Sequence, residues 1–70
     1  MQLADYTAAQ KSFSHALLLD SHFPSAFYGR GVAYILGGQT EQGLVDLSQA
    51  GEYGLYTAYN LIKKYSQTKK

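Results

Sequence analysis

The sequence has 70 residues, enough for one small domain, and its formal net charge of +1 excludes a strongly basic or acidic protein. It has no cysteine, which excludes a disulfide framework and a thiolate metal site and fits a reducing, cytoplasmic compartment. No apolar run approaches the ~20 residues that a membrane-spanning helix needs, so we expect no membrane span.

The first half of the chain predicts two helices. Between residues 4 and 19, apolar side chains recur at spacings of three and four, as on one face of a helix: Tyr6, Ala9, Phe13, Ala16 and Leu17. Pro24 disfavours helix at Phe23 but is well tolerated in the first turn of a helix. We therefore expect the second helix to run from Pro24 or Ser25 to Leu36.

The second half predicts two more helices. Gly37 and Gly38 end the second one, and Thr40 is a good N-cap for a third that runs to Glu52. A fourth helix is expected from Leu55 or Tyr56 to about Ser66. Nothing reads as a strand, because β-branched residues are sparse and no alternation persists. The predicted fold is all-α, with about four helices.

The chain also repeats itself at an offset of 34 residues, which is the kind of period that helical repeat proteins show. The shift places residues of the first helix on similar residues of the third: Ala9 on Gly43, Phe13 on Leu47, Ser14 on Ser48, Ala16 on Ala50 and Leu19 on Tyr53. These two helices are thus copies of one element, and the second helix is the other half of a two-helix unit.

These residues resemble the tetratricopeptide repeat family over about residues 5–53. Phe27, Gly31 and Tyr34 match its first helix, Gly43, Leu47 and Ala50 match its second, and Ala9, Phe13 and Ala16 match the second helix of a preceding repeat. The resemblance implies antiparallel helical hairpins stacked in a right-handed superhelix. The chain departs from the family pattern at three positions, where the family usually has Pro, Leu and Pro: Ser21, Arg30 and Leu55. Independently of the family, glycine at 31 and 43 predicts close approach of two helices.

The last unit is similar to the Sel1-like repeat, through Ala50, Gly54, Ala58 and Leu61. We interpret the fourth helix as a terminal cap with a polar side that faces solvent. The chain is then a single domain over residues 1–70. It comprises the second helix of a partial repeat (1–23), a complete repeat (24–53), and a capping helix with a basic tail (54–70).

Catalysis finds little support in the sequence. His15 and His22 have no cluster of carboxylates around them, and the acids are dispersed: Asp5, Asp20, Glu41, Asp46 and Glu52. They are interpreted as solvated side chains, and Arg30 and Gln39 as ordinary surface groups. No nucleophile elbow, phosphate loop or dinucleotide fingerprint occurs. We expect no enzyme activity, no cofactor and no metal site.

Protein or peptide binding is what the family resemblance implies, on a groove lined mainly by first helices. Carried onto this chain, the partner-binding residues are Tyr28, Val32 and Ile35 on the second helix and Asn60 and Lys64, with Gln67, on the fourth. The predicted function is a protein–protein interaction scaffold. The alternative is a structural fragment or self-associating assembly module, in which Tyr28, Val32 and Ile35 are buried by packing.

Two further expectations concern partners. The first helix of the chain resembles the second helix of a repeat whose first helix is missing. The sequence therefore leaves open a homo-oligomer that covers the apolar face of this helix. Four lysines lie in the last eight residues, at 63, 64, 69 and 70, but a net charge of +1 is a weak electrostatic footprint for nucleic acid. We interpret these lysines as helix-end charges and a solvated tail.

Overall fold

The chain folds into four helices, with no strand among residues 3–66, which are the residues that this computed structural model describes. The helices are α1 (Leu3–Leu19), α2 (Pro24–Leu36), α3 (Thr40–Glu52) and α4 (Thr57–Ser66). The predicted all-α class is confirmed, and the bounds of the first three helices agree with prediction to within a residue. The predictions for Gln67, Lys69 and Lys70 lie outside the described residues.

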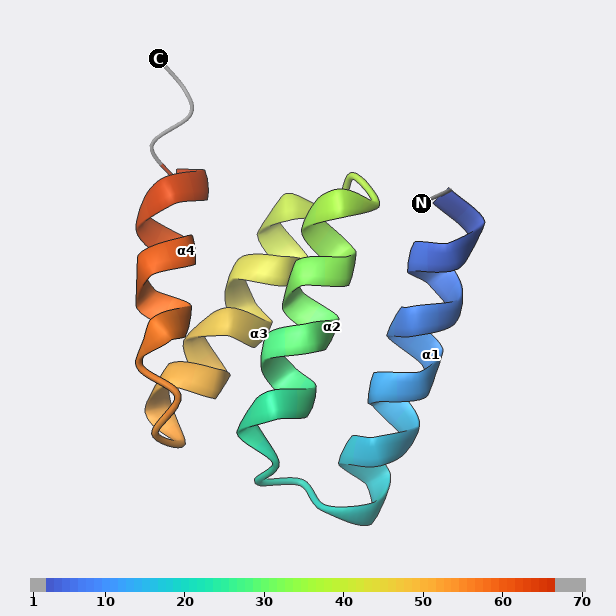
Figure 1. Cartoon of the computed structure of the whole chain (residues 1–70), viewed down its shortest axis with the longest axis horizontal. Helices are drawn as coiled ribbons and strands as arrows, with labels where there is room; N and C mark the ends of the chain where they lie inside the picture. The colour runs from blue at the N-terminus through green and yellow to red at the C-terminus, as the bar shows by residue number, and fades with distance from the viewer. Residues whose placement is uncertain (1–2, 67–70) are drawn as a thin grey trace.

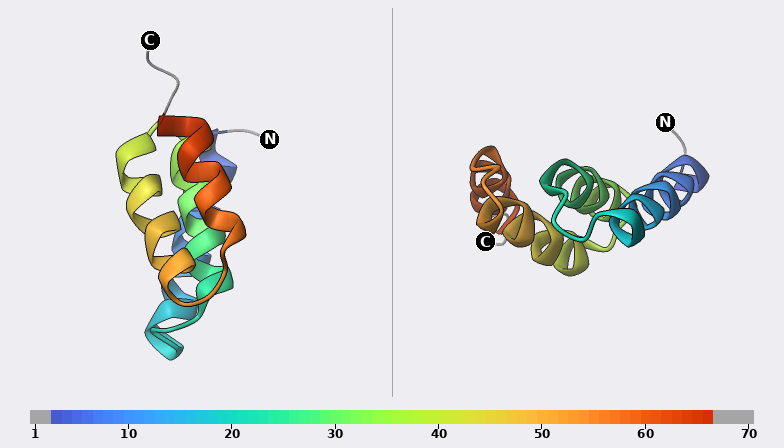
Figure 2. Two further views of the ribbon diagram at one scale, coloured as in Figure 1. Left: turned by 90° about the vertical axis from the view of Figure 1, so that its left-hand side faces the viewer. Right: turned by 90° about the horizontal axis from the view of Figure 1, so that it is seen from below.

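Consecutive helices run antiparallel and lie side by side in one row (Figure 1). Seen from below, α3 lies to one side of α2 and α4, so the row is bent (Figure 2). The Cα atoms span 38 × 29 × 15 Å. Because an α-helix with its side chains is about 10–12 Å across, the row is only one to two helices thick. The antiparallel order agrees with the predicted hairpins, whereas their right-handed superhelical stacking stays a prediction.

The close approach predicted at Gly31 and Gly43 joins α2 to α3. A Cβ atom added at Gly31 would lie 2.8 Å from the carbonyl oxygen of Gly43, and one added at Gly43 would meet the carbonyl oxygen of Gly31. Leu47 packs on Gly31 from α3, and Leu47 is the one large side chain that is fully buried among the described residues. A core built largely from glycine and alanine lets helix backbones touch, so the hairpin depends on small residues at these positions.

The start of α3 differs from the prediction in one detail. Thr40 was expected to be the N-cap, but it is the first helical residue, and Gln39 occupies the cap position without a side-chain hydrogen bond. The reason is that the Gly43 N–H donates to the Gln39 carbonyl oxygen at 3.0 Å, so the helical bonding pattern already begins at Gln39. The hydroxyl of Thr40 therefore lies one position too late to cap the helix.

The turn between α2 and α3 depends on Gly38, whose φ is +96°. Left-handed backbone costs a side-chain-bearing residue roughly 1–2 kcal/mol, and asparagine tolerates it best. Nothing lies within 4 Å of a Cβ atom added there, so the backbone alone decides the effect. We expect Gly38→Val to lower the free energy of unfolding by about that amount, and Gly38→Asn to lower it clearly less. Urea denaturation checks this, and equal losses in the two variants would contradict it.

The fourth helix covers α3 with its apolar side and exposes its polar side, as predicted for a capping helix. Ala58 is fully buried, while Leu61, Ile62 and Tyr65 pack against the core. The ring of Tyr59 lies over Gly51 of α3, but the side chain remains 45% exposed. The exposed positions include the polar residues of this helix: Asn60, Lys63 and Lys64.

Candidate partner-binding surface

The structure divides the five predicted partner-binding residues into three groups. Tyr28 and Val32 on α2 are partly buried and pack against the core, while Asn60 and Lys64 on α4 are exposed. Ile35 is only 9% exposed and belongs to the core itself. The candidate surface therefore consists of four of the five residues.

Ile35 is a correction to the sequence analysis, which placed it on the binding face. It follows Gly31 by four residues, so both lie on the side of α2 that faces α3. A Cβ atom added at Gly43 would meet the Ile35 side chain, which confirms that Ile35 packs at the α2–α3 contact. Its side chain fills the space between these helices and does not reach a partner.

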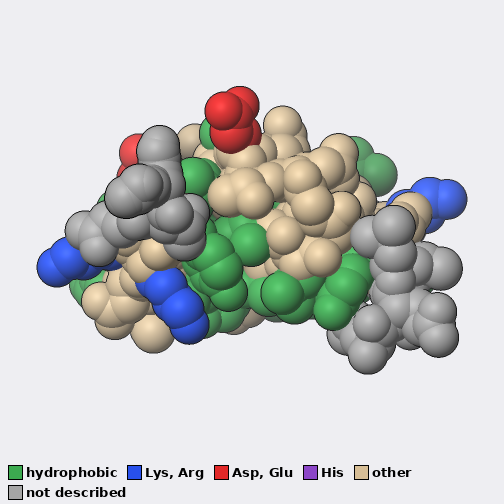
Figure 3. Space-filling model, turned by 90° about the horizontal axis from the view of Figure 1, so that it is seen from above, with side chains coloured by type: hydrophobic (Ala, Val, Ile, Leu, Met, Phe, Trp, Pro, Cys, Tyr) green, Lys and Arg blue, Asp and Glu red, His purple; other side chains and the backbone are tan. Residues whose placement is uncertain are grey.

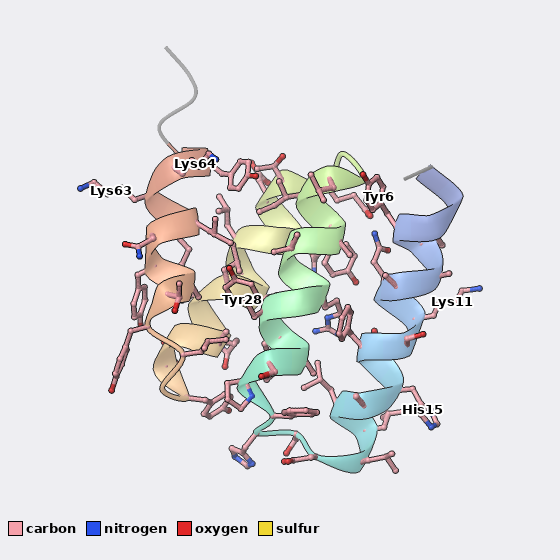
Figure 4. All side chains as sticks on the ribbon, viewed as in Figure 1. Tyr6, Lys11, His15, Tyr28, Lys63 and Lys64 are labelled. Atoms are coloured by element: carbon pink, nitrogen blue, oxygen red, sulfur yellow. The ribbon has the colours of Figure 1, made fainter. Side chains whose placement is uncertain are left out.

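The remaining four residues lie at similar places along two helices that run in the same direction. α2 and α4 both run upward in Figure 1, beginning at Pro24 and Thr57. Tyr28 is the fifth residue of α2 and Asn60 is the fourth residue of α4, and Val32 and Lys64 each follow one turn later. Figure 4 shows Tyr28 on the side of α2 toward α4, with Lys63 extending away from the row on the far side of α4. The two helices thus carry two apolar positions on α2 and an amide and an ammonium group on α4.

Hydrophobic side chains also reach the surface between the two ends of the chain. Seen from above, they are visible in the middle of the molecule among backbone and other side chains, with Lys or Arg side chains at the left (Figure 3). The Lys64 ammonium lies 5.7 Å from the ring centroid of Tyr65, a distance at which a cation and an aromatic face attract each other. The surface therefore combines apolar side chains with a cation.

An ion pair that the sequence analysis missed lies at the contact of α1, α2 and α3. Arg30 donates to both carboxylate oxygens of Asp46, from Nε at 2.8 Å and from Nη2 at 3.0 Å, and its Nη1 donates to Ser14 Oγ at 3.0 Å. Asp46 is only 2% exposed. The bidentate pair is the strongest polar link between α2 and α3, and Ser14 extends it to α1.

The surroundings of Arg30 fix its charge and position. Its guanidinium carbon lies 5.8 Å from the ring centroid of Phe27 and 5.9 Å from that of Tyr34. The hydrogen bond to Asp46 raises the pKa of Arg30 above its ordinary value, against the opposing effect of burial. When folding raises the pKa of a basic group, the group stabilises the fold at every pH below its ordinary pKa. This stabilisation is lost only in strong alkali, as the pH rises through the raised pKa. The pair therefore does not act as a pH switch near neutrality.

Arg30 and Asp46 were predicted to be an ordinary surface group and a solvated acid, so both predictions were wrong. A signal was present: Arg30 precedes Gly31, and Asp46 precedes Leu47. Since Gly31 and Leu47 touch across the hairpin, their preceding residues can also meet. That inference needs the register between the two helices, which a single sequence does not state.

The histidines form no site with acidic residues in the part of the chain that the structure describes. His15 is exposed on α1, and His22 shares a contact with Ser21 Oγ at 3.3 Å in the loop before α2. The His22 ring also meets the Tyr53 ring edge-on at 5.0 Å. Among residues 3–66, no three or more His, Asp or Glu side chains gather as metal ligands would. None of the helices within that range is long and apolar enough to cross a membrane.

These features define an all-α protein that displays a row of antiparallel helices, with no cluster of metal-ligand side chains among residues 6–66. Comparison with known proteins finds no matching family model, no matching curated protein and no matching solved structure. The resemblance to tetratricopeptide and Sel1-like repeats consequently stays a prediction from the sequence.

Proposed function

We propose that the chain is a non-catalytic protein–protein interaction module that binds a peptide or protein segment on the surface of α2 and α4. The surface is formed by Tyr28, Val32, Asn60 and Lys64. The observation that carries the proposal is their placement at similar distances from the first residues of two helices that run in the same direction. The backbone-to-backbone contact with α3 holds α2 in place, so Tyr28 and Val32 are presented with little freedom, which reduces the entropy lost on binding.

We also propose a structural class, a cellular location and a kind of partner for the protein. A helical-repeat scaffold related to tetratricopeptide and Sel1-like repeats accounts for the 34-residue internal match and for the two-helix units. A cytoplasmic location is consistent with the absence of cysteine. A protein segment is favoured over nucleic acid because the net charge is only +1.

A second candidate is a self-associating assembly module. It is favoured by α1, where Leu18 is 84% exposed and Leu19 is 78% exposed. Adjacent large apolar side chains in solvent mark a surface that another molecule can cover. Sedimentation at rising concentration tests this function, because the assembly module would dimerise whereas the interaction module would stay monomeric without its partner.

Lys64→Glu tests the proposed binding surface, with Lys63→Glu as its matched control on the same helix. A peptide selected against the full chain from a displayed library serves as the ligand, and its Kd is measured by titration. We expect Lys64→Glu to weaken binding about tenfold, because it removes an attractive charge and introduces a repulsive one. Lys63 extends away from the row, so Lys63→Glu is expected to change Kd less than about twofold.

The controls exclude a general loss of structure. Both lysines are exposed, so each variant should keep the helical circular dichroism and melting temperature of the parent chain. Equal effects of the two variants would place the site elsewhere, as would no effect of either. Aspartate at Tyr28 or Val32 is a poorer test, because both side chains pack against the core.

A further inference from the structure

An apolar groove lies between α1 and α2. Its volume is about 280 Å³, and its walls come from Tyr6, Ala9 and Phe13 of α1 and from Val32, Ala33 and Leu36 of α2, among others. Among residues 6–66, whose side chains the structure describes, no charged side chain lines it. The ring of Phe13 packs over Gly29, so the groove continues the contact between the two helices. This groove shares Tyr28 and Val32 with the surface of α2 and α4 but includes no residue of α4.

The internal repeat shows what fits such a surface. α1 and α2 are joined by four residues, and so are α3 and α4, so the chain contains the same helix–loop–helix unit twice. In the second unit, α2 lies on Gly43 and Leu47 of α3. Ala9 and Phe13 are the equivalents of these two residues in the first unit, 34 positions earlier.

The equivalent positions of the two units differ in how far they are buried. Gly43 and Leu47 are buried, whereas Ala9 and Phe13 are only partly buried. The difference arises because two helices, α2 and α4, pack on α3, whereas among residues 3–66 only α2 packs substantially on α1. The first unit thus has the small and large side chains of a helix-binding face, with a helix on one side of it only.

We propose that this groove binds an apolar helix of a partner polypeptide. That helix carries glycine or alanine between two large side chains, in the pattern of Phe27, Gly31 and Tyr34 on α2. The small residue faces Ala9, as Gly31 faces Gly43. The absence of charged lining residues selects an uncharged docking face, since burial of an unpaired charge is costly.

A second copy of this chain is a poorer occupant. α2 is already held against α3, and the apolar face of α1 already packs on α2 through Phe13, which leaves α4 as the helix to donate. Ala26 and Ala58 are both fully buried near the start of their helices, which aligns α4 with α2. Five residues after each alanine stand Gly31 in α2 and Lys63 in α4. A lysine would therefore take the place where close approach needs glycine.

The test tethers a known helix of the proposed type to the full chain. A copy of residues 24–39 is joined ahead of Met1, so that α2 with its own turn serves as the partner helix at high effective concentration. We expect the melting temperature to rise by about 5 °C or more over the untethered chain, because the added helix covers apolar surface. An added helix with aspartate in the place of its central glycine should give no rise.

Two matched variants show where the added helix binds. Ala9→Glu places a charge in the groove and should abolish the rise, whereas Ala8→Glu on the exposed neighbour should preserve it. Each tethered variant is compared with its own untethered form, so a change in the stability of α1 itself is subtracted. No rise in the parent fusion, or an equal rise with Ala9→Glu, overturns the proposal.

Sedimentation of the untethered chains distinguishes a helix of another polypeptide from a helix of a second copy of this chain. We expect a monomer for the parent chain and for both variants. A dimer that Ala9→Glu dissociates and Ala8→Glu does not would identify a second copy as the occupant and overturn the proposal. Neither experiment uses the library peptide or alters α4, so their failure is distinct from failure of the surface of α2 and α4.

Discussion

Gly43→Ala is expected to destabilise the protein, although alanine favours a helix by about 1 kcal/mol over glycine. The new Cβ atom would meet the carbonyl oxygen of Gly31 and lie 3.1 Å from the backbone nitrogen of Ile35. Both are backbone atoms of α2, so the clash is relieved only by moving α2 away from α3. Overpacking of this kind costs typically 1–3 kcal/mol, and here it also opens the buried contact at Leu47.

We therefore expect a net loss of about 2 kcal/mol for Gly43→Ala, a large part of the stability of a domain this small. Urea denaturation monitored by circular dichroism measures the loss. Gly43→Val adds two further methyl groups at the same contact and should leave the chain largely unfolded. An unchanged or higher free energy of unfolding for Gly43→Ala would show that the two helices can separate at little cost.

Gly51→Ala is the matched control on the same helix. Its Cβ atom would also meet a neighbour, but that neighbour is the end of the Tyr59 ring, on a side chain that is 45% exposed. The ring can rotate into solvent, so the helix propensity of alanine should prevail. We expect this variant to be neutral or up to about 1 kcal/mol more stable. The same substitution thus has opposite effects according to whether backbone or a mobile side chain opposes it.

The sequence predicts the elements of this fold because each boundary has a local cause. Pro24 begins α2 and disfavours helix before it, while Gly37 and Gly38 end it. The approach of α2 and α3 is also predictable, because interior glycines at Gly31 and Gly43 are unfavourable in a helix without a packing reason. These inferences require only neighbours along the chain and a helical period.

The candidate site is less predictable because it depends on how one helix is rotated against the next. Ile35 has the same apolar character as Val32, and its burial follows from its place on the stripe that faces α3. Arg30 and Asp46 have ordinary surface composition, yet the close glycine contact beside them brings them together. Local sequence gives neither the rotation of one helix against the next nor the register between them. The burial of Ile35 and the pairing of Arg30 with Asp46 could therefore be assigned only once the arrangement of the helices was known.

Asp46→Ala is the second change with a large expected effect. It removes a carboxylate side chain that is 4% exposed and leaves Arg30, whose side chain is 21% exposed, without its bidentate partner. Breaking a buried pair by removing one member costs about 3–5 kcal/mol, and we expect the lower end because Arg30 retains some contact with water. Thermal and urea denaturation should both show the loss.

A double variant separates the value of the pair from the cost of an orphaned charge. In Arg30→Met with Asp46→Leu, both charges are replaced by apolar groups of similar size, so most of the stability should return. Arg30→Met alone should be at least as harmful as Asp46→Ala, because the carboxylate that it leaves is the more buried partner. A double variant as unstable as the single ones would contradict this account and imply that the pair itself stabilises the fold. In that case the link from α2 through Asp46 and Ser14, rather than the glycine contact alone, would hold the three helices in register.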